Sequence, residues 1–303
     1  MQAEPDLQAH RQHVLAVLAA PTAAALDELM VRQQRLRQAR AMASANAQFE
    51  LRTGMEGAYP IGLSSEELER FNICVVGGAV RDRLLGCGPS PDLDCVVPAQ
   101  RWDAFLAYVQ SAGYRPRTVV RALACKLQDG PAAGREFVAT RSDGYAVGGR
   151  LQHVEPVAMA GDPWRRDFTL QALYADPRSG ALWDPFGAAG ARQLQVILPG
   201  AMAEDPLRVV RLVRAQLTHS LPVEAQTERE ARAVSSCAPL TSALEGFRLQ
   251  AELDRAARAG VLGPLLRTLE LWHWSGLRAA DPIHDAVRAR SATQWLRRAG
   301  LAA

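Results

Sequence analysis

Two acidic residues separated by one apolar residue stand in the segment PDLDCVV. Asp92 and Asp94 flank Leu93. In an extended strand, residues i and i+2 project from the same face, so both carboxylates would point one way and Leu93 the other. Mg²⁺ is usually bound by one or two carboxylates together with phosphate oxygens of a substrate. Taken alone, this pair is more typical of a solvated acidic turn, so its meaning depends on its neighbours.

A pair of glycines lies shortly before these acids. Gly77 and Gly78 end the apolar run ICVV and precede AVRDRLLG, a segment that indicates a helix containing Arg81. Glycine lets the backbone approach a ligand closely, and the free N–H groups at the start of a helix favour anions. Glycines, helix and paired acids in one short window therefore predict a triphosphate site beside a site for divalent metal. Two metal ions in such a site could activate an attacking oxygen and shield the leaving group.

The elements that must position these residues form three stretches. Residues 1–70 indicate a helical N-terminal extension with a linker, which we interpret as a packing or oligomerisation arm rather than an RNA-gripping one. Residues 71–198 contain short apolar runs, interrupted by the helical segment AQRWDAFLAYVQSAG, and predict a compact α+β domain. Residues 199–303 are helical in pattern, with segments such as EDPLRVVRLVRAQL and FRLQAELDRAARAG.

Composition limits the class of protein without deciding its partner. The chain has 303 residues, 48% hydrophobic and 22% charged, with a net charge of +3, which is typical of a globular protein. Lys126 is the only lysine, so almost all basic residues are arginines, which suit phosphate and base recognition but also follow from genomic base composition. Five cysteines without paired spacing favour the reducing cytoplasm. No apolar run predicts a membrane span or a secretory signal.

The motifs continue in an order that identifies a family resemblance. After the glycine–acid window come REFVATRSD, WRRDFTLQAL, DPRSGALWDPFG and EDPLRVVRLVRA. In this order they resemble the class II tRNA nucleotidyltransferases, the CCA-adding enzymes in particular, and the bacterial poly(A) polymerases. The resemblance implies an α+β fold: a mixed-sheet head domain of the nucleotidyltransferase (polymerase beta-like) type, followed by an all-helical neck and body.

The resemblance also implies roles for particular residues. Asp92 and Asp94 would hold Mg²⁺, and Glu136 would be a third catalytic acid. Asp205 and Arg208, three apart on the predicted helix, would share a face and select the base of CTP or ATP. The residues expected to bind the nucleotide are Gly77, Gly78, Arg81, Arg141, Arg165, Arg166, Asp167, Gln171, Asp205, Arg208, Arg211 and Arg214.

Several departures from the family pattern leave alternatives open. Gln171 stands where the family has asparagine, Ala188 replaces the second glycine of the DPF turn with no acid after it, and the helical part is short. We expect transfer of CMP and AMP to the 3′ end of a tRNA. Addition of C only, of A only or of poly(A) to another RNA is the alternative, as is a non-catalytic RNA-binding relative. The sequence does not determine the oligomeric state.

Overall fold

The computed structural model describes residues 4–44, 58–88, 90, 92–244 and 246–274. Parts of the predicted extension (45–57) and of the predicted body (275–303) lie outside the described residues. The chain divides into two compact units, Met1–Gln33 with Tyr145–Arg150 and Leu198–Ala303, and Gln34–Gly144 with Leu151–Ile197. We call them the helical unit and the sheet unit, and each is described by itself.

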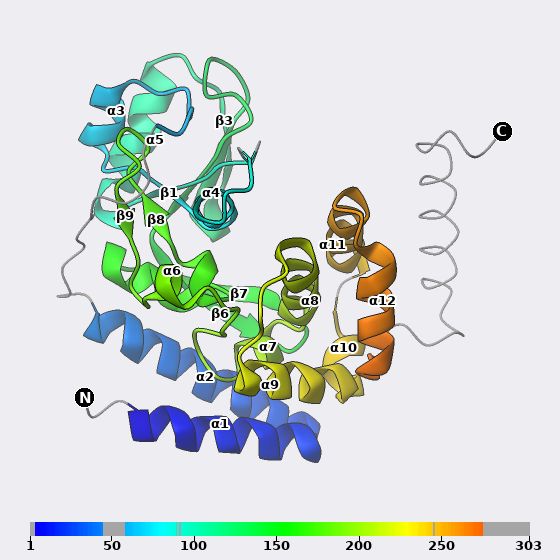
Figure 1. The fold of residues 1–303 in the computed structure, drawn as a ribbon. Coiled ribbons are helices and arrows are strands. Elements are labelled where there is room, and N and C mark those ends of the chain that lie inside the picture. Colours follow the sequence, from blue (N-terminus) through cyan, green and yellow to red (C-terminus); the bar gives the residue numbers. More distant parts are fainter. Residues whose placement is uncertain (1–3, 45–57, 89, 91, 245, 275–303) are drawn as a thin grey trace. The chain divides into compact units, whose positions relative to one another are not determined.

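The sheet unit is built on a seven-stranded mixed sheet (Figure 1), as the sequence predicts. Neighbouring strands are antiparallel except β2 and β5, which are parallel. In spatial order the strands are β3 (Pro116–Val119), β4 (Ala124–Leu127), β5 (Glu136–Ala139), β2 (Asp94–Val97), β1 (Cys74–Val76), β8 (Tyr174–Ala175) and β9 (Leu182–Trp183).

One row of aligned residues crosses all seven strands, and we call it the register row. Residues paired directly across neighbouring strands project from the same face of a sheet. The first four members are exposed and charged, whereas the last three are buried and apolar or aromatic. In spatial order the row is Arg117, Lys126, Glu136, Asp94, Val76, Tyr174 and Trp183.

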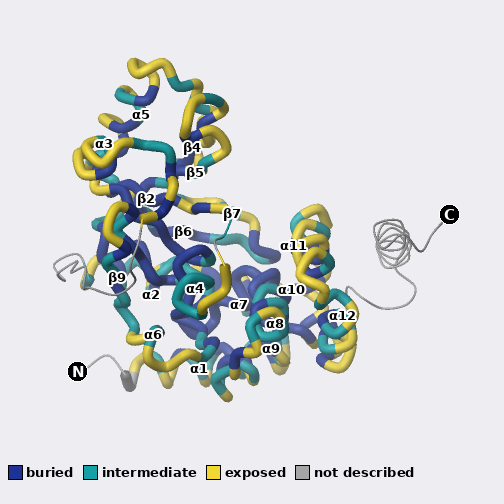
Figure 2. Tube along the Cα trace, turned by 45° about the horizontal axis from the view of Figure 1, so that its top comes forward, coloured by how far each residue is buried: buried dark blue, intermediate teal, exposed yellow. Residues whose placement is uncertain are grey.

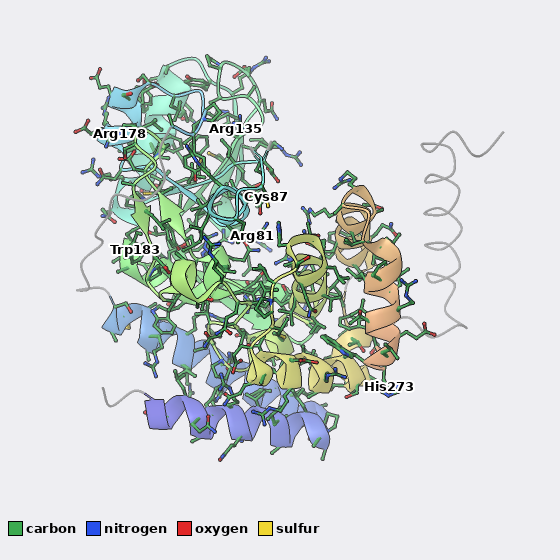
Figure 3. All side chains as sticks on the ribbon, viewed as in Figure 1. Arg81, Cys87, Arg135, Arg178, Trp183 and His273 are labelled. Carbon is green, nitrogen blue, oxygen red and sulfur yellow. The ribbon has the colours of Figure 1, made fainter. Side chains whose placement is uncertain are left out.

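Different elements cover the two faces of the sheet. On the face of the register row, Met159 and Ala160 of the 3₁₀ helix η3 (Met159–Arg165) share a hydrophobic cluster with buried strand residues, among them Val76. On the opposite face, Phe105 of α5 (Trp102–Ser111) lies 5.0 Å from Phe137, ring centroid to centroid. Figure 3 labels Trp183, at the far end of the row.

Shorter elements complete the sheet unit. The glycine-containing segment after β1 forms α4 (Gly78–Leu84), and the DPF turn leads into α6 (Ala188–Ala191). Strands β6 and β7 pair with each other in a separate two-stranded sheet. The remaining bounds are α3 (Ser65–Arg70), η1 (Ala99–Arg101), η2 (Val120–Ala122), β6 (Arg141–Ala146), β7 (Arg150–Pro156) and η4 (Thr169–Gln171).

The predicted N-terminal helices are α1 (Glu4–Ala19) and α2 (Ala23–Ala43). Helix α2 has a buried stripe that begins with leucines and then becomes polar at Gln33 and Arg37, both fully buried. In the helical unit, the Gln33 side-chain amide donates to the carbonyl oxygen of Pro199 at 2.7 Å. The polar part of this stripe is therefore satisfied by backbone distant in sequence.

The helical unit confirms the predicted helices but corrects the start of one. The sequence predicts a helix from Glu204, whereas the structure has a break at Asp205, which is extended (φ −131°, ψ 93°). Proline disfavours the helical conformation of the residue before it, so Pro206 ends one helix and begins the next. The helices are α7 (Ala201–Glu204), α8 (Leu207–His219), α9 (Ala225–Ser236), α10 (Ala238–Ser242), α11 (Gly246–Arg258) and α12 (Leu262–Leu271).

Helices α11 and α12 alternate between buried and exposed residues along their length (Figure 2), as helices with one packed face do. Over the described residues, no helix combines the length and the apolar character that crossing a membrane requires.

Candidate functional site

Three carboxylates gather at one end of the parallel strand pair. Asp94 and Glu136 are the first residues of β2 and β5 and are directly aligned. Asp92 precedes β2 and is exposed, as are Asp94 and Glu136. Leu93 between the two aspartates is buried, so the predicted alternation holds although Asp92 lies outside the strand.

The electrostatics of Glu136 indicate that these acids act on one another. Partial burial raises the pKa of Glu136, repulsion by Asp94 and Asp92 raises it further, and Lys126 opposes the rise. A divalent cation would relieve this repulsion. The described residues contain no group of three or more His, Cys, Asp or Glu side chains arranged as metal ligands. Two carboxylates plus substrate phosphates are nevertheless the usual protein setting for Mg²⁺, so the donor set fits that ion.

The glycine turn lies on the other side of β2, after β1. Gly77 has φ +80° and ψ −131°, a conformation open to glycine and unfavourable for other residues. A Cβ atom at Gly77 would lie 3.7 Å from the Gln171 carbonyl oxygen, and one at Gly78 would lie 3.6 Å from Nη2 of Arg81. The structure therefore brings together four residues predicted to bind the nucleotide. Arg81 (Figure 3) is largely buried and pairs with Asp82, Nη2 to Oδ1, at 2.5 Å.

A buried carboxylate that the sequence analysis missed organises most of the other predicted arginines. Asp162 is fully buried and accepts hydrogen bonds from Arg165 (Nε, 2.7 Å), Arg166 (Nη2, 2.8 Å) and the Tyr174 hydroxyl (2.5 Å). It also accepts from the backbone N–H of Arg141 at 3.1 Å. Burial alone would raise the pKa of Asp162, but Arg165 and Arg166 hold it well below its ordinary value. The sequence signal that could have identified Asp162 is its position three residues before Arg165, within the same short helix.

A second buried acid extends this network. Asp143 accepts a hydrogen bond from Nε of Arg141 at 2.8 Å and lies 3.7 Å from Nη1 of Arg165. Burial works against its charge, yet Arg165 and Arg141 lower the pKa of Asp143. Asp167, also predicted to contact the nucleotide, follows this pair of arginines and is half-buried. The result is a rigid polar platform in which three predicted arginines are fixed by two acids.

In the helical unit, Asp205 and Arg208 are both almost completely buried. Oδ2 of Asp205 accepts a hydrogen bond from Nη2 of Arg248 at 2.7 Å. Arg208 donates from Nη1 to the Ala201 carbonyl oxygen at 3.0 Å. A Cβ atom at Gly149 would lie 2.2 Å from Oδ1 of Asp205, so only glycine fits beside this carboxylate. The sequence analysis did not foresee Arg248 as the partner of Asp205.

The two following arginines converge on a single acid. Nε of Arg211 lies 3.1 Å from Oε1 of Glu252, and Nε of Arg214 lies 3.0 Å from Oε2. Arg255 also pairs with Glu252, at 2.7 Å. The Glu252 side chain is only 2% exposed, so this carboxylate fixes both Arg211 and Arg214, which the sequence analysis assigns to nucleotide binding.

The sequence is similar to a known protein family and to curated proteins. Residues 73–197 match the model of the poly A polymerase head domain. The multifunctional CCA protein of Xanthomonas campestris pv. campestris is 34% identical over 227 residues, which covers 72% of this chain and 52% of that protein. The chain spans between a third and about a half of the length of the curated relatives it matches.

Solved structures share the fold. An apo form of a CCA-adding enzyme superposes with a TM-score of 0.59 at 24% identity, over 70% of this chain and 51% of that one. A tRNA nucleotidyltransferase complexed with a primer tRNA and an incoming ATP analogue gives a TM-score of 0.54 at 23% identity, over 76% and 68% of the two chains. These similarities show a mixed-sheet head followed by a helical region.

Proposed function

We propose that the chain, whose residues 73–197 match the poly A polymerase head domain, is a nucleotidyltransferase of the CCA-adding family and transfers CMP and AMP from CTP and ATP to the 3′ end of a tRNA. The observation that carries this proposal is the arrangement around β2. Asp94 is aligned with Glu136 on one side, while β1 ends in the Gly77–Gly78 turn on the other. Acids and phosphate-binding backbone thus flank one strand.

The reaction divides among these residues. The 3′-hydroxyl oxygen attacks the α-phosphorus, and the bond to the pyrophosphate oxygen breaks. Asp92 and Asp94 would hold Mg²⁺, which would supply charge neutralisation at the phosphate oxygens. Glu136 accepts the proton of the attacking hydroxyl, a role that suits a carboxylate whose pKa is raised above its ordinary value by partial burial and by Asp94. Such a site acts mainly by positioning and by charge stabilisation.

The remaining predicted residues bind and select the nucleotide. Gly77, Gly78 and Arg81 orient the triphosphate, and Gln171 lies beside this turn. The platform around Asp162 presents Arg141, Arg165, Arg166 and Asp167 to the sugar. Asp205 and Arg208 select the base, and Arg211 and Arg214 hold the triphosphate or the RNA end. Support for these roles comes from the partners already described, because a side chain held by buried hydrogen bonds binds a ligand with little loss of conformational freedom.

Addition of only one kind of base is a second candidate, favoured by the DPF turn. Asp184 caps α6 with both carboxylate oxygens, accepting from the N–H of Ala188 at 2.9 Å and of Ala189 at 2.8 Å. Ala188 is buried within this capped turn. The family resemblance implies that this segment acts as a hinge when the enzyme changes from adding C to adding A, and a turn held in this way would resist that movement.

The test is incorporation of labelled nucleotide by the purified protein with Mg²⁺. The substrates are tRNAs that lack CCA, lack only the final A, or are complete, each given CTP, ATP or both. Ordered addition of C, C and A supports the proposal, addition of one base supports the second candidate, and no incorporation on any tRNA contradicts both.

Matched variants exclude a contaminating enzyme. The exposed acids make Asp92→Ala with Asp94→Ala a pair that should fold normally yet lose activity. Asp103→Ala removes an exposed acid from α5 on the opposite face and should remain active. Incorporation by the double variant at the wild-type rate would contradict the assigned role of the aspartates.

A further inference from the structure

We propose that Arg117 of β3 and Lys126 of β4 bind the sugar–phosphate backbone of the RNA whose 3′ end is extended. This inference rests on the proposed function. It implies that the RNA strand lies across strands β4 and β3 of the sheet unit. We call these two residues the basic edge, because β3 is the edge strand of the sheet and β4 is its neighbour.

The register row places the basic edge in line with the acids. Arg117 pairs with Lys126, Lys126 with Glu136, and Glu136 with Asp94. Neighbouring strands are about 4.8 Å apart, so the Cα atom of Lys126 lies roughly 10 Å from that of Asp94, and that of Arg117 roughly 14 Å. All four side chains project from the same face, in the order of two cations followed by two anions.

The basic edge differs from the arginines predicted to bind the nucleotide because no acid among the described residues holds it by a hydrogen bond. Arg117 and Lys126 are exposed, and neither makes a side-chain hydrogen bond or ion pair within the described part of the chain. Arg81, Arg165 and Arg166, by contrast, are tied to buried or neighbouring acids. Lys126 interacts electrostatically with its neighbour Glu136 but, like Arg117, is held by no hydrogen bond or ion pair over the same residues, so both cations can reach a phosphate. Phosphate contacts dominate protein affinity for nucleic acids.

The topology leaves this side of β2 for RNA rather than for the incoming nucleotide. The Gly77–Gly78 turn follows β1, which adjoins β2 on the side away from β5. With the triphosphate on the β1 side and the attacking hydroxyl at Glu136, the preceding phosphates of the RNA extend over β4 and β3. Beyond Arg117, the exposed side chains of Val119 and Val120 (53% and 80%) offer an apolar surface for riboses or bases.

The first test measures affinity for tRNA lacking CCA, by fluorescence anisotropy without nucleotide or Mg²⁺, at several salt concentrations. Each lost phosphate contact should lower the slope of log K against log salt by about 0.7 to 1. We expect Lys126→Ala and Arg117→Ala each to weaken binding, and the double variant to weaken it by roughly 10- to 100-fold at low salt.

Arg70→Ala is the matched control. Arg70 is exposed at the end of α3, next to Phe71, whose ring lies 5.4 Å from that of Phe105 in the layer covering the opposite face. Its removal should leave both affinity and slope unchanged. A double variant at the basic edge with wild-type affinity and slope would overturn the proposal.

The single lysine allows a second test on the unaltered protein. An amine-reactive acyl ester modifies the side-chain amine only at Lys126, and mass spectrometry of the peptides measures the extent. Bound tRNA should protect Lys126, whereas CTP with Mg²⁺ should not. Equal modification with and without saturating tRNA would overturn the proposal even if the variants misfold.

Kinetics separate this inference from the proposed function. Arg117→Ala, which leaves Lys126 beside Glu136, should raise KM for tRNA while leaving KM for CTP and kcat at saturating tRNA close to wild type. If the wild type incorporates no nucleotide, the proposed function fails, but anisotropy and protection still decide whether the basic edge binds RNA. A loss of kcat with unchanged KM for tRNA would contradict the backbone contact.

Discussion

Arg37 on helix α2 donates a hydrogen bond of 2.7 Å from Nη1 to the backbone carbonyl oxygen of Asp143, 106 residues further along the chain. Its Nε donates to the carbonyl oxygen of Trp164 at 3.3 Å. Asp143 is one of the two acids of the acid–arginine platform, and Trp164 directly precedes Arg165 of the same platform. One buried side chain of an N-terminal helix therefore fixes two backbone segments that carry residues proposed to bind the nucleotide.

Arg37→Ala should lower the free energy of unfolding by about 2–4 kcal/mol, because it removes the guanidinium donor from two backbone carbonyl oxygens, one of them buried, and creates a void. The midpoint of denaturant unfolding measures this change. Arg35→Ala on the exposed face of the same helix should stay within about 0.5 kcal/mol of wild type. Equal effects of the two variants would contradict a bracing role for Arg37.

Glu230 should make the helical unit less stable as pH rises from about 4.5 to about 7. Burial raises the pKa of Glu230 from 4.5 to about 7, although Arg11 and Arg208 favour its charged form. Between these values the folded chain holds a proton that the unfolded chain has released, so the free energy of unfolding falls as pH rises. The total is on the order of 3 kcal/mol.

Glu230→Gln removes this titration while keeping an oxygen to accept from the N–H groups of Gly200 and Met202. Its stability relative to wild type should therefore increase from pH 5 to pH 8, as thermal or urea unfolding at both values would measure. Glu228→Gln, which changes a half-exposed residue of α9 paired with Arg232, should show no such trend. A constant difference between Glu230→Gln and wild type would refute the raised pKa.

Gly77→Ala and Gly78→Ala should separate backbone strain from phosphate access. The positive φ of Gly77 makes alanine there cost about 1–3 kcal/mol of stability. Gly78 is the first residue of α4, and a Cβ atom there meets only an ordinary contact, so alanine should fold at least as well as wild type.

If the backbone at this turn binds the triphosphate, the added methyl group of Gly78→Ala should raise KM for CTP by tenfold or more despite the preserved stability. Steady-state kinetics together with unfolding midpoints give both quantities. An unchanged KM would remove Gly78 from the proposed phosphate site.

Asp205→Asn should change the choice between CTP and ATP. If Asp205 accepts a hydrogen bond from the base, replacing an acceptor oxygen by an amide should alter the ratio of kcat/KM for the two nucleotides by roughly 10- to 100-fold. Glu224→Ala, which removes the N-cap of α9 in the same unit, should cost stability without altering that ratio. An unaltered ratio for Asp205→Asn would leave this carboxylate a purely structural role with Arg248.

Local patterns made much of the sheet unit predictable. The turn after ICVV, the helix that follows it and the outward placement of Asp92 and Asp94 around Leu93 depend on neighbouring residues alone. The break before α8 could also have been predicted, because a residue that precedes proline avoids the helical conformation. The sequence analysis instead extended the helix back to Glu204, because the residues after Pro206 have helical periodicity.

Contacts between residues far apart in the sequence could not be predicted from such local patterns. Strands β2 and β5 pair although β3 and β4 lie between them along the chain. The number of residues between Asp94 and Glu136 therefore could not predict that the two are aligned. The acceptors of the predicted arginines, such as Glu252 for Arg214, depend on helix packing in the same way. The motifs therefore predicted which residues matter, while the structure determines which carboxylate each arginine contacts.

The buried polar stripe of α2 also has a consequence for synthesis on the ribosome. Gln33 precedes its acceptor, the Pro199 carbonyl, by 166 residues. At a translation rate of roughly 5–20 residues per second, α2 would wait on the order of 10 s before that acceptor is made. During this interval Gln33 must remain hydrated, so the part of α2 around Gln33 cannot complete its packing until Pro199 has been made, and it is open to chaperones that hold nascent chains.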